Sequence, residues 1–381
     1  MRIEVLETYR EIFKKEPEGY LQSGGRFELL GNHTDHNHGL TLASTCTLMI
    51  EGAYAKEDKN IVRVVSKNQC DFEISLDNTE PQEEKVDRSA CFIRGIAHYL
   101  KLHGYKIGGF SVYTESTIPP GAGVSSSAAF EILLGKIFNK LYNNNKISIL
   151  ELAKAGQYAE NNYFGKKSGL LDQIACASNG VSYIDFGDIA NPNIEIIHHT
   201  FGGYQFVIVD TGKSHSNLNP LYSSITSDMW SAAKKMGHQF LREGSLEELE
   251  LVKENLTEGE YQRAIHFYNE NERVIKGLIC LKNYDFAGFF ACMKGSEQSS
   301  RNLLKNAMVH GQYHGSLAEA IDISNKAMDY QGASKINGGG FGGSIICIVP
   351  KEKLEKYLAV MRRKYGDKHV FLVSMLNNTE E

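Results

Sequence analysis

The chain has 381 residues, 42% of them apolar, which is enough for two packed domains because a single core rarely exceeds about 250–300 residues. Its 41 basic and 46 acidic residues are mixed along the sequence and give a net charge of −5, so the basic surface that nucleic acid requires is not expected. No signal peptide is visible at the start, and no apolar run approaches the roughly 20 residues of a membrane span. We therefore expect a cytoplasmic protein without nucleic-acid or membrane partners.

The first half of the chain is predicted to mix strands and helices. Apolar periodicity predicts a helix over 1–13, strands over 40–55 and 61–74, an acidic solvated loop over 77–87, and a helix over 88–103. These are followed by a strand over 109–115, a glycine turn, helices over 125–141, 148–163 and 170–177, a strand over 181–186, and a linker over 187–192.

The second half is predicted to be mainly helical. A strand over 205–210 precedes helices over 224–241, 246–252, 260–281 and 285–303, and then a strand, a glycine run and a second strand over 333–349. We predict an α+β protein of two lobes, with an N-terminal domain over 1–190 and a C-terminal domain over 191–381. The seven cysteines are scattered and never form Cys-x-x-Cys, so we expect buried, reduced thiols.

One candidate site is a glycine turn that precedes a predicted helix. The turn and the helix start consist of Gly121, Ala122, Gly123, Val124, Ser125, Ser126 and Ser127. Free backbone N–H groups at a helix start, close glycine backbone and serine hydroxyls together suit the phosphates of a nucleotide. A glycine-rich turn with serine N-caps remains the alternative, and no Walker A sequence is present.

A second cluster of polar residues lies in the segment GRFELLGNHTDHNHG, over 25–39. Arg26 can stabilise charge on a transferring phosphoryl group or lower the pKa of a carboxylate, and Asp35 can accept hydrogen bonds from sugar hydroxyls. The histidines His33, His36 and His38 leave open a zinc site. We regard this as the weaker interpretation, because a strand would place His33 and His36 on opposite faces.

The third cluster, SGLLDQ, follows a helix that ends near Glu160. Asp172 is flanked by leucines, so its charge needs a partner if it is buried, and Arg26 is a candidate. Capping of the helix that follows is the alternative. Near the end of the chain, NGGGFGG precedes a predicted strand rather than a helix, which argues against a dinucleotide fold and favours a loop that lines a site.

Taken together, the segments GRFELLGNHTDHNHG, PPGAGVSSSAAFE and INGGGFGGS resemble, in order and spacing, the three motifs of the GHMP kinases. Within that superfamily the first motif is most similar to that of the galactokinases. The resemblance implies a two-lobed α+β fold, an N-terminal lobe with a mixed sheet, a C-terminal lobe with an antiparallel sheet, and a sugar bound between the lobes. It also implies ATP and Mg²⁺ as cofactors and a monomer or weak homo-oligomer.

The resemblance assigns roles to individual positions. Asp172 corresponds to the catalytic aspartate and Arg26 to the catalytic arginine, and phosphates would lie along 121–127. The magnesium ligands would be Ser126 and Glu160. Sugar contacts would come from Asn32, His33, Asp35, Gly169 and Tyr222, the last of which follows His215 at the family's spacing. Asp172 would accept the proton of the anomeric hydroxyl as that oxygen attacks the γ-phosphorus of ATP, giving a sugar 1-phosphate.

Two positions depart from the galactokinase pattern Gly-Glu-His-Thr-Asp-Tyr. Asn32 stands in place of a sugar-contacting glutamate, and His36 stands in place of the tyrosine. Galactose is therefore the first expectation for the substrate, and arabinose, galacturonate or an N-acetylhexosamine are alternatives. A homologue that senses sugar without catalysis is a further alternative. The intact serine segment, residues 125–129, together with Asp172 and Arg26, argues against it.

Overall fold

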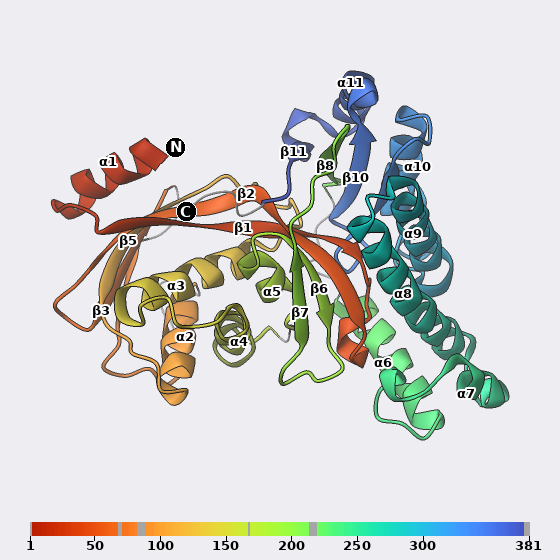
Figure 1. Ribbon diagram of the computed structural model, residues 1–381, viewed down its shortest axis with the longest axis horizontal. Helices are drawn as coiled ribbons and strands as arrows, with labels where there is room; N and C mark the ends of the chain where they lie inside the picture. The colour runs from red at the N-terminus through yellow and green to blue at the C-terminus, as the bar shows by residue number, and fades with distance from the viewer. Residues whose placement is uncertain (1, 68–70, 82–88, 167, 213–218, 377–381) are drawn as a thin grey trace. The chain divides into compact units, whose positions relative to one another are not determined.

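The computed structural model describes residues 2–67, 71–81, 89–166, 168–212 and 219–376 (Figure 1). The chain divides into two compact units. Unit 1 contains Met1–Arg26, Thr45–Pro119 and Ser125–Asn179, and unit 2 contains Phe27–Ser44, Pro120–Val124 and Gly180–Glu381. Both units are discontinuous in sequence, whereas the predicted domains meet at a single boundary at residue 190; that boundary stays a prediction.

Unit 1 consists of a sheet and five α-helices among the described residues. Its helices are α1 (Arg2–Phe13), α2 (Ala90–Leu102), α3 (Ser126–Tyr142), α4 (Ile149–Ala159) and α5 (Leu171–Ala177), with a π-helical turn over Glu160–Phe164. Its strands are β3 (Ile61–Ser66), β4 (Phe72–Ser75), β5 (Phe110–Ser116) and parts of β1 (Gly19–Leu30) and β2 (Leu40–Lys56).

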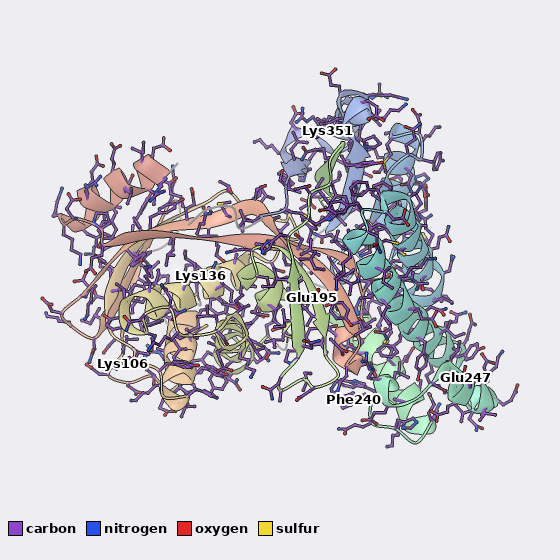
Figure 2. All side chains as sticks on the ribbon, in the orientation of Figure 1. Lys106, Lys136, Glu195, Phe240, Glu247 and Lys351 are labelled. Atoms are coloured by element: carbon purple, nitrogen blue, oxygen red, sulfur yellow. The ribbon has the colours of Figure 1, made fainter. Side chains whose placement is uncertain are left out.

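The sheet of unit 1 is mixed, as predicted, because β3 pairs with β5 in parallel while β4 and β2 pair antiparallel with their neighbours. Alternate residues face opposite sides. Val112 belongs to the core formed with α2, α3 and α4, while Tyr113 packs with Tyr9 of α1. Lys136 of α3, labelled in Figure 2, donates to the carbonyl of Gln22 at 3.2 Å.

Unit 2 contains the remaining elements. Its strands are the remaining parts of β1 and β2, β6 (Val181–Asp185), β7 (Asn193–Ile197), β8 (Tyr204–Asp210), β9 (Ala333–Asn337), β10 (Ser344–Pro350) and β11 (Val370–Val373). Its helices are α6 (Asn219–Lys235), α7 (Leu246–Leu251), α8 (Glu258–Lys282), α9 (Phe286–Ser299), α10 (Leu317–Ala327) and α11 (Leu354–Tyr365).

Unit 2 is built on a four-stranded antiparallel sheet in the order β11-β8-β10-β9. Every residue of β10 is buried, and α10 and α11 contribute to the core on one face. The long helices α8 and α9 run side by side (Figure 1). Helix α8 begins with a capping box of Thr257 and Glu260, which satisfies two backbone donors at its start.

Most predicted elements are confirmed to within a few residues, and the exceptions have identifiable causes. The run predicted as one strand over 61–74 forms the two strands β3 and β4. The elements β1, β7, α10, α11 and β11 were not predicted. Helix α11 buries only Tyr357 and Met361, and β7 is partly exposed along its length, so both carry a weak apolar signal.

Two further observations bear on the sequence-based expectations. The six cysteines in the described part of the chain are free and buried, in line with the prediction of reduced thiols. Within the same described ranges, no helix is long and apolar enough to cross a membrane.

Candidate active site

The structure brings together Arg26 and Asp172, which are far apart in the sequence and both belong to unit 1. Arg26 lies near the middle of β1, and its Nε donates to Oδ1 of Asp172 at 2.6 Å. Ser125, the residue before α3, donates its hydroxyl to Oδ2 of the same carboxylate at 2.5 Å. Each carboxylate oxygen of Asp172 therefore has a donor that fixes its direction.

The environment of Asp172 keeps its carboxylate ionised. Burial alone would raise its pKa, but the Arg26 charge and the hydrogen bonds from Arg26 and Ser125 leave the pKa below its usual range. The side chain of Asp172 is 30% exposed whereas that of Arg26 is 9% exposed, so the carboxylate is the accessible member of the pair. Asp172 is not the helix cap that was the alternative interpretation, because the N-cap of α5 is Leu170.

A second carboxylate of unit 1, that of Glu160, follows α4 at the start of the π-helical turn, and this residue is 2% exposed. It accepts hydrogen bonds from Ser168 Oγ at 2.5 Å, Lys166 Nζ at 2.6 Å and Gln173 Nε2 at 3.1 Å. The hydroxyl that reaches it from the serine segment is that of Ser127, at 3.4 Å. Ser126, the predicted magnesium ligand, is exposed at the first position of α3.

The oxygen atoms around Glu160 suit Mg²⁺, which prefers carboxylate, hydroxyl, phosphate and water oxygens. Lys166 is the only cation bonded to Glu160 among the described residues, and its side chain is 56% exposed. Those residues include no group of three or more His, Cys, Asp or Glu side chains arranged to hold a metal ion. A magnesium ion held here would therefore need oxygens from its nucleotide as well as from the protein.

The glycine turn before α3 is shaped by close contacts in unit 2. Gly121 and Gly123 both have positive φ, at 83° and 69°. A Cβ atom at Gly123 would lie 2.4 Å from Oγ of Ser344, so glycine is required there. Asn337 Nδ2 donates to the carbonyl of Gly123 at 3.1 Å. The glycine run after Asn337 is thus tied to the glycine turn and is followed by strand β10, as predicted.

The segment after β1 is a turn and a short 3₁₀ helix over Asp35–Asn37, not a strand. The strand argument about His33 and His36 is therefore wrong, since His36 Nε2 lies 3.4 Å from His33 Nδ1. His33 Nε2 in turn bonds the carbonyl of Gly339 at 2.8 Å. Burial lowers the pKa of both imidazoles. The two rings therefore form a buried hydrogen-bonded chain that ends at the carbonyl of Gly339.

The remaining predicted sugar contacts differ in accessibility. Asp35 begins the 3₁₀ helix and is partly exposed, and Gly169 is exposed just before α5. Tyr222 of α6 is partly buried, and its hydroxyl donates to the carbonyl of Gly340 at 2.7 Å. Asn32 is 1% exposed and bonds only protein groups among those described. His215 lies outside the described residues. All five sugar contacts stay predictions.

Several buried polar residues near these positions were not found from the sequence. Glu131 of α3 is fully buried beside Gln173, and Lys335 of β9 is fully buried and paired with Glu28. Each had a usable signal, because Glu131 is the one charged residue in the apolar stretch 128–135 of α3, and Lys335 is the one charged residue of β9. The signal does not reveal the partner, which comes from a different part of the chain.

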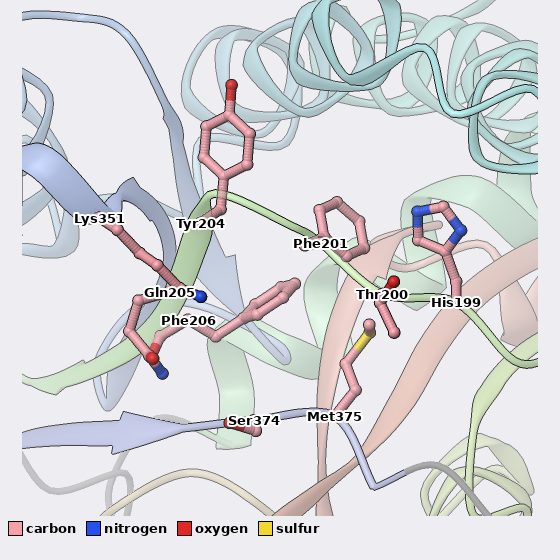
Figure 3. A pocket seen from close by; sticks show the side chains of 9 residues that line it. All are labelled: His199, Thr200, Phe201, Tyr204, Gln205, Phe206, Lys351, Ser374 and Met375. Atoms are coloured by element: carbon pink, nitrogen blue, oxygen red, sulfur yellow. The ribbon is translucent and has the colours of Figure 1, made fainter.

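A cavity of about 180 Å³ in unit 2 contains none of the predicted site residues (Figure 3). Its lining includes the aromatic residues Phe201, Tyr204 and Phe206, together with Lys351 and Met375. It is therefore separate in sequence and composition from the serine, aspartate and histidine positions described above.

The fold and the serine segment define a GHMP kinase. The family model for the GHMP kinases N terminal domain matches residues 91–180. The fold is also that of solved structures: a Lactococcus lactis galactokinase complexed with galactose (TM-score 0.84, 24% identity, 99% of this chain and 98% of that one) and a Methanococcus jannaschii mevalonate kinase (TM-score 0.65, 17% identity, 94% and 98%).

The galactokinase galactose-binding signature matches residues 7–56, which contain the first motif. A galactokinase from Lactobacillus helveticus is 31% identical over 378 residues, which cover 96% of this chain and 94% of the relative. One from Limosilactobacillus reuteri is 29% identical over 384 residues, covering 95% and 94%. The chain belongs to the galactokinase family.

Proposed function

We propose that the protein is an ATP-dependent galactokinase that converts galactose and ATP to galactose 1-phosphate and ADP. The observation that carries the proposal is the carboxylate of Asp172, ionised, partly exposed, and fixed by Arg26 and Ser125. Family membership and the galactose-binding signature support galactose as the acceptor. We further propose a cytoplasmic monomer or weak homo-oligomer, which suits the free cysteines.

In the proposed reaction, the anomeric oxygen of the sugar attacks the γ-phosphorus of ATP. A new O–P bond forms, the bond to the ADP oxygen breaks, and Asp172 takes the hydroxyl proton. The low pKa of Asp172 makes it a weak base, but phosphoryl transfer passes through a loose transition state, in which alignment and charge stabilisation matter more than base strength. Arg26 would orient Asp172 and stabilise negative charge on the transferred group.

The phosphates of ATP are proposed to lie along the glycine turn and the start of α3, over 121–127. Backbone N–H groups at the start of a helix of 17 residues, together with the close glycine backbone, favour anions there. Glu160 and the hydroxyls of Ser126 and Ser127 would hold Mg²⁺, which supplies charge neutralisation of the phosphates when bound.

The proposal is tested by the release of ADP across a panel of sugars, measured for the parental protein and for Asp172→Asn. We expect galactose-dependent turnover that falls by about 10²–10⁴-fold in the variant, because a positioned proton acceptor contributes that much. Binding of ATP should change little. Parental turnover in Asp172→Asn would show that the base is misassigned.

The same panel distinguishes the alternative functions. Asn32 is neutral and bonded inside unit 2, which keeps arabinose, galacturonate and N-acetylhexosamines among the sugars to be assayed. Turnover of one of these at a higher kcat/KM than galactose would revise the substrate but not the chemistry. Binding of sugar and ATP without any ADP release would instead favour a sensor.

A further inference from the structure

A network of buried polar side chains in unit 2 has not been given a role above. Its charged members are Glu28 of β1 and Lys335 of β9, which are 3% and 0% exposed. Lys335 Nζ donates to Oε1 of Glu28 at 2.9 Å and to the carbonyl of Ile336 at 2.9 Å. A buried ammonium of this kind needs a carboxylate beside it, because removing one partner leaves an uncompensated charge.

Asn32 completes this network. Its Nδ2 donates to Oε1 of Glu28 at 3.1 Å and to the carbonyl of Gly338 at 2.7 Å. Its Oδ1 accepts from Nδ2 of Asn306 at 2.9 Å and from Oγ of Ser300 at 3.4 Å. The amide nitrogen and the amide oxygen of Asn32 are therefore both hydrogen-bonded, and the residue is 1% exposed.

The identity of residue 32 follows from these neighbours. A carboxylate of the same shape would place an oxygen 2.7 Å from the Gly338 carbonyl and 3.1 Å from the Glu28 carboxylate, where an N–H now lies. Two carboxylates would then share one buried ammonium, and like charges at this distance cannot both stay ionised without cost. The network thus holds a single negative charge, on residue 28.

Asn32 also connects this charge to the predicted sugar segment. The next residue, His33, bonds the carbonyl of Gly339, so two consecutive side chains attach the turn after β1 to two consecutive carbonyls of the glycine run. We propose that Glu28, Asn32 and Lys335 act as a positioning unit that holds the sugar-binding segment over 31–35 and thereby sets its affinity for the sugar. This inference rests on the proposed function.

Isosteric substitutions separate the effect of an added negative charge from the effect of losing the hydrogen bond to the Gly338 carbonyl. Asn32→Asp adds a second carboxylate and loses the donor to Gly338. Glu28→Gln leaves Lys335 without its counter-ion. In the double variant Glu28→Gln/Asn32→Asp, one negative charge is present again, and the amide introduced at position 28 can accept from Lys335 and donate to the new carboxylate. The four proteins form a double-mutant cycle, measured by thermal unfolding, kcat, and the KM values for sugar and ATP.

We expect Asn32→Asp to unfold at lower temperature and to raise the sugar KM at least 10-fold, with the ATP KM within about 2-fold of parental. The double variant should be more stable than Asn32→Asp although it carries one more substitution. Its sugar KM should stay raised, because no variant with aspartate at residue 32 can donate to Gly338. A merely structural role would restore stability and sugar KM together.

The control is Asn139→Asp in unit 1. Asn139 is also a buried amide with both ends bonded, to the carbonyl and N–H of Ile147. It should lose stability without a change in the sugar KM. The inference is overturned if the double variant is no more stable than Asn32→Asp, or if Asn32→Asp keeps a parental sugar KM.

Failure of the proposed function would look different. If the parental protein releases no ADP with any sugar, that function is wrong. Thermal unfolding of the double-mutant cycle, together with sugar dissociation constants from calorimetry, then tests whether Glu28, Asn32 and Lys335 position a sugar-binding segment.

Discussion

Two carboxyl groups in unit 1 are held in opposite protonation states by their neighbours. Asp172 is ionised because Arg26 and Ser125 outweigh the effect of burial. Glu131 is fully buried, and its pKa is raised to about 8. Burial is the larger cause and the nearby charge of Glu160 is the second. Glu131 therefore carries a proton at neutral pH.

This protonation of Glu131 predicts a pH-dependent cost to stability. Because its pKa is raised in the folded state, Glu131 is protonated to a larger extent in the folded protein than in the unfolded chain, and its contribution to stability falls as pH rises from about 4.5 to 8. This group alone contributes a loss of about 1.4 kcal/mol per pH unit. In urea unfolding, Glu131→Gln should therefore gain stability over the parental protein as pH rises through this window.

Glu11→Gln, at an exposed position of α1, is the control for removing a charge. The difference in the free energy of unfolding between Glu11→Gln and the parental protein should vary little with pH. The protonated state assigned to Glu131 would be contradicted if Glu131→Gln and the parental protein differed in free energy of unfolding by the same amount at pH 5 and at pH 8.

Among the elements, the glycine turn and α3 form the most constrained connection. Ser125 has a left-handed φ of 57° at the N-cap of α3, and Gly123 has a φ of 69° in the turn that precedes it. A Cβ atom at residue 123 would lie 2.4 Å from Oγ of Ser344, and Asn337 donates to the carbonyl of Gly123. The turn is thus constrained by the residues on either side of the glycine run as well as by its own sequence.

The contribution of that contact is tested with two glycine substitutions. Gly123→Ala adds both left-handed backbone strain and a clash with Ser344, whereas Gly104→Ala adds the strain alone, because nothing lies within 4 Å of its Cβ position. Left-handed strain costs about 1–2 kcal/mol. We expect Gly123→Ala to lose more stability than Gly104→Ala and to raise the ATP KM severalfold. An unchanged ATP KM would argue against phosphates at this turn.

At the scale of the whole molecule, stability at acid pH is limited by buried imidazoles in unit 2. His33 and His36 have lowered pKa values because of burial, and burial lowers the pKa of His266 to about 4. His266 bonds the carbonyl of Asn32 and the hydroxyl of Ser299, both at 2.8 Å. These rings must be neutral in the folded protein.

The contribution of these imidazoles to the free energy of unfolding should therefore fall on acidification, with a sign opposite to that of the Glu131 contribution. The unfolded chain binds protons at histidine below about pH 6.5 while folded His266 does not until about pH 4, so stability present above 6.5 is lost between these values. His266→Gln should be less stable at pH 7.5 but show a shallower loss down to pH 5 in urea unfolding. An equal slope in the variant and the parental protein would refute the neutral assignment.

Features that depend on neighbouring residues can be predicted without coordinates. The glycine turn before a helix, the strand after Gly343, and most helices and strands follow from local backbone preferences and apolar periodicity, and they are where the sequence placed them. The motif pattern also identified the family, since three motifs in order are readable without coordinates.

Contacts between distant side chains depend on how the chain packs. Arg26 and Asp172 are 146 residues apart, and Glu28 and Lys335 are 307 apart, so neither contact follows from local preference. Packing also decided that Asn32 is enclosed by four protein groups, and that His33 and His36 bond each other across a turn instead of facing apart on a strand. Burial and partner identity are properties of the packed chain, and they set the charge of each group.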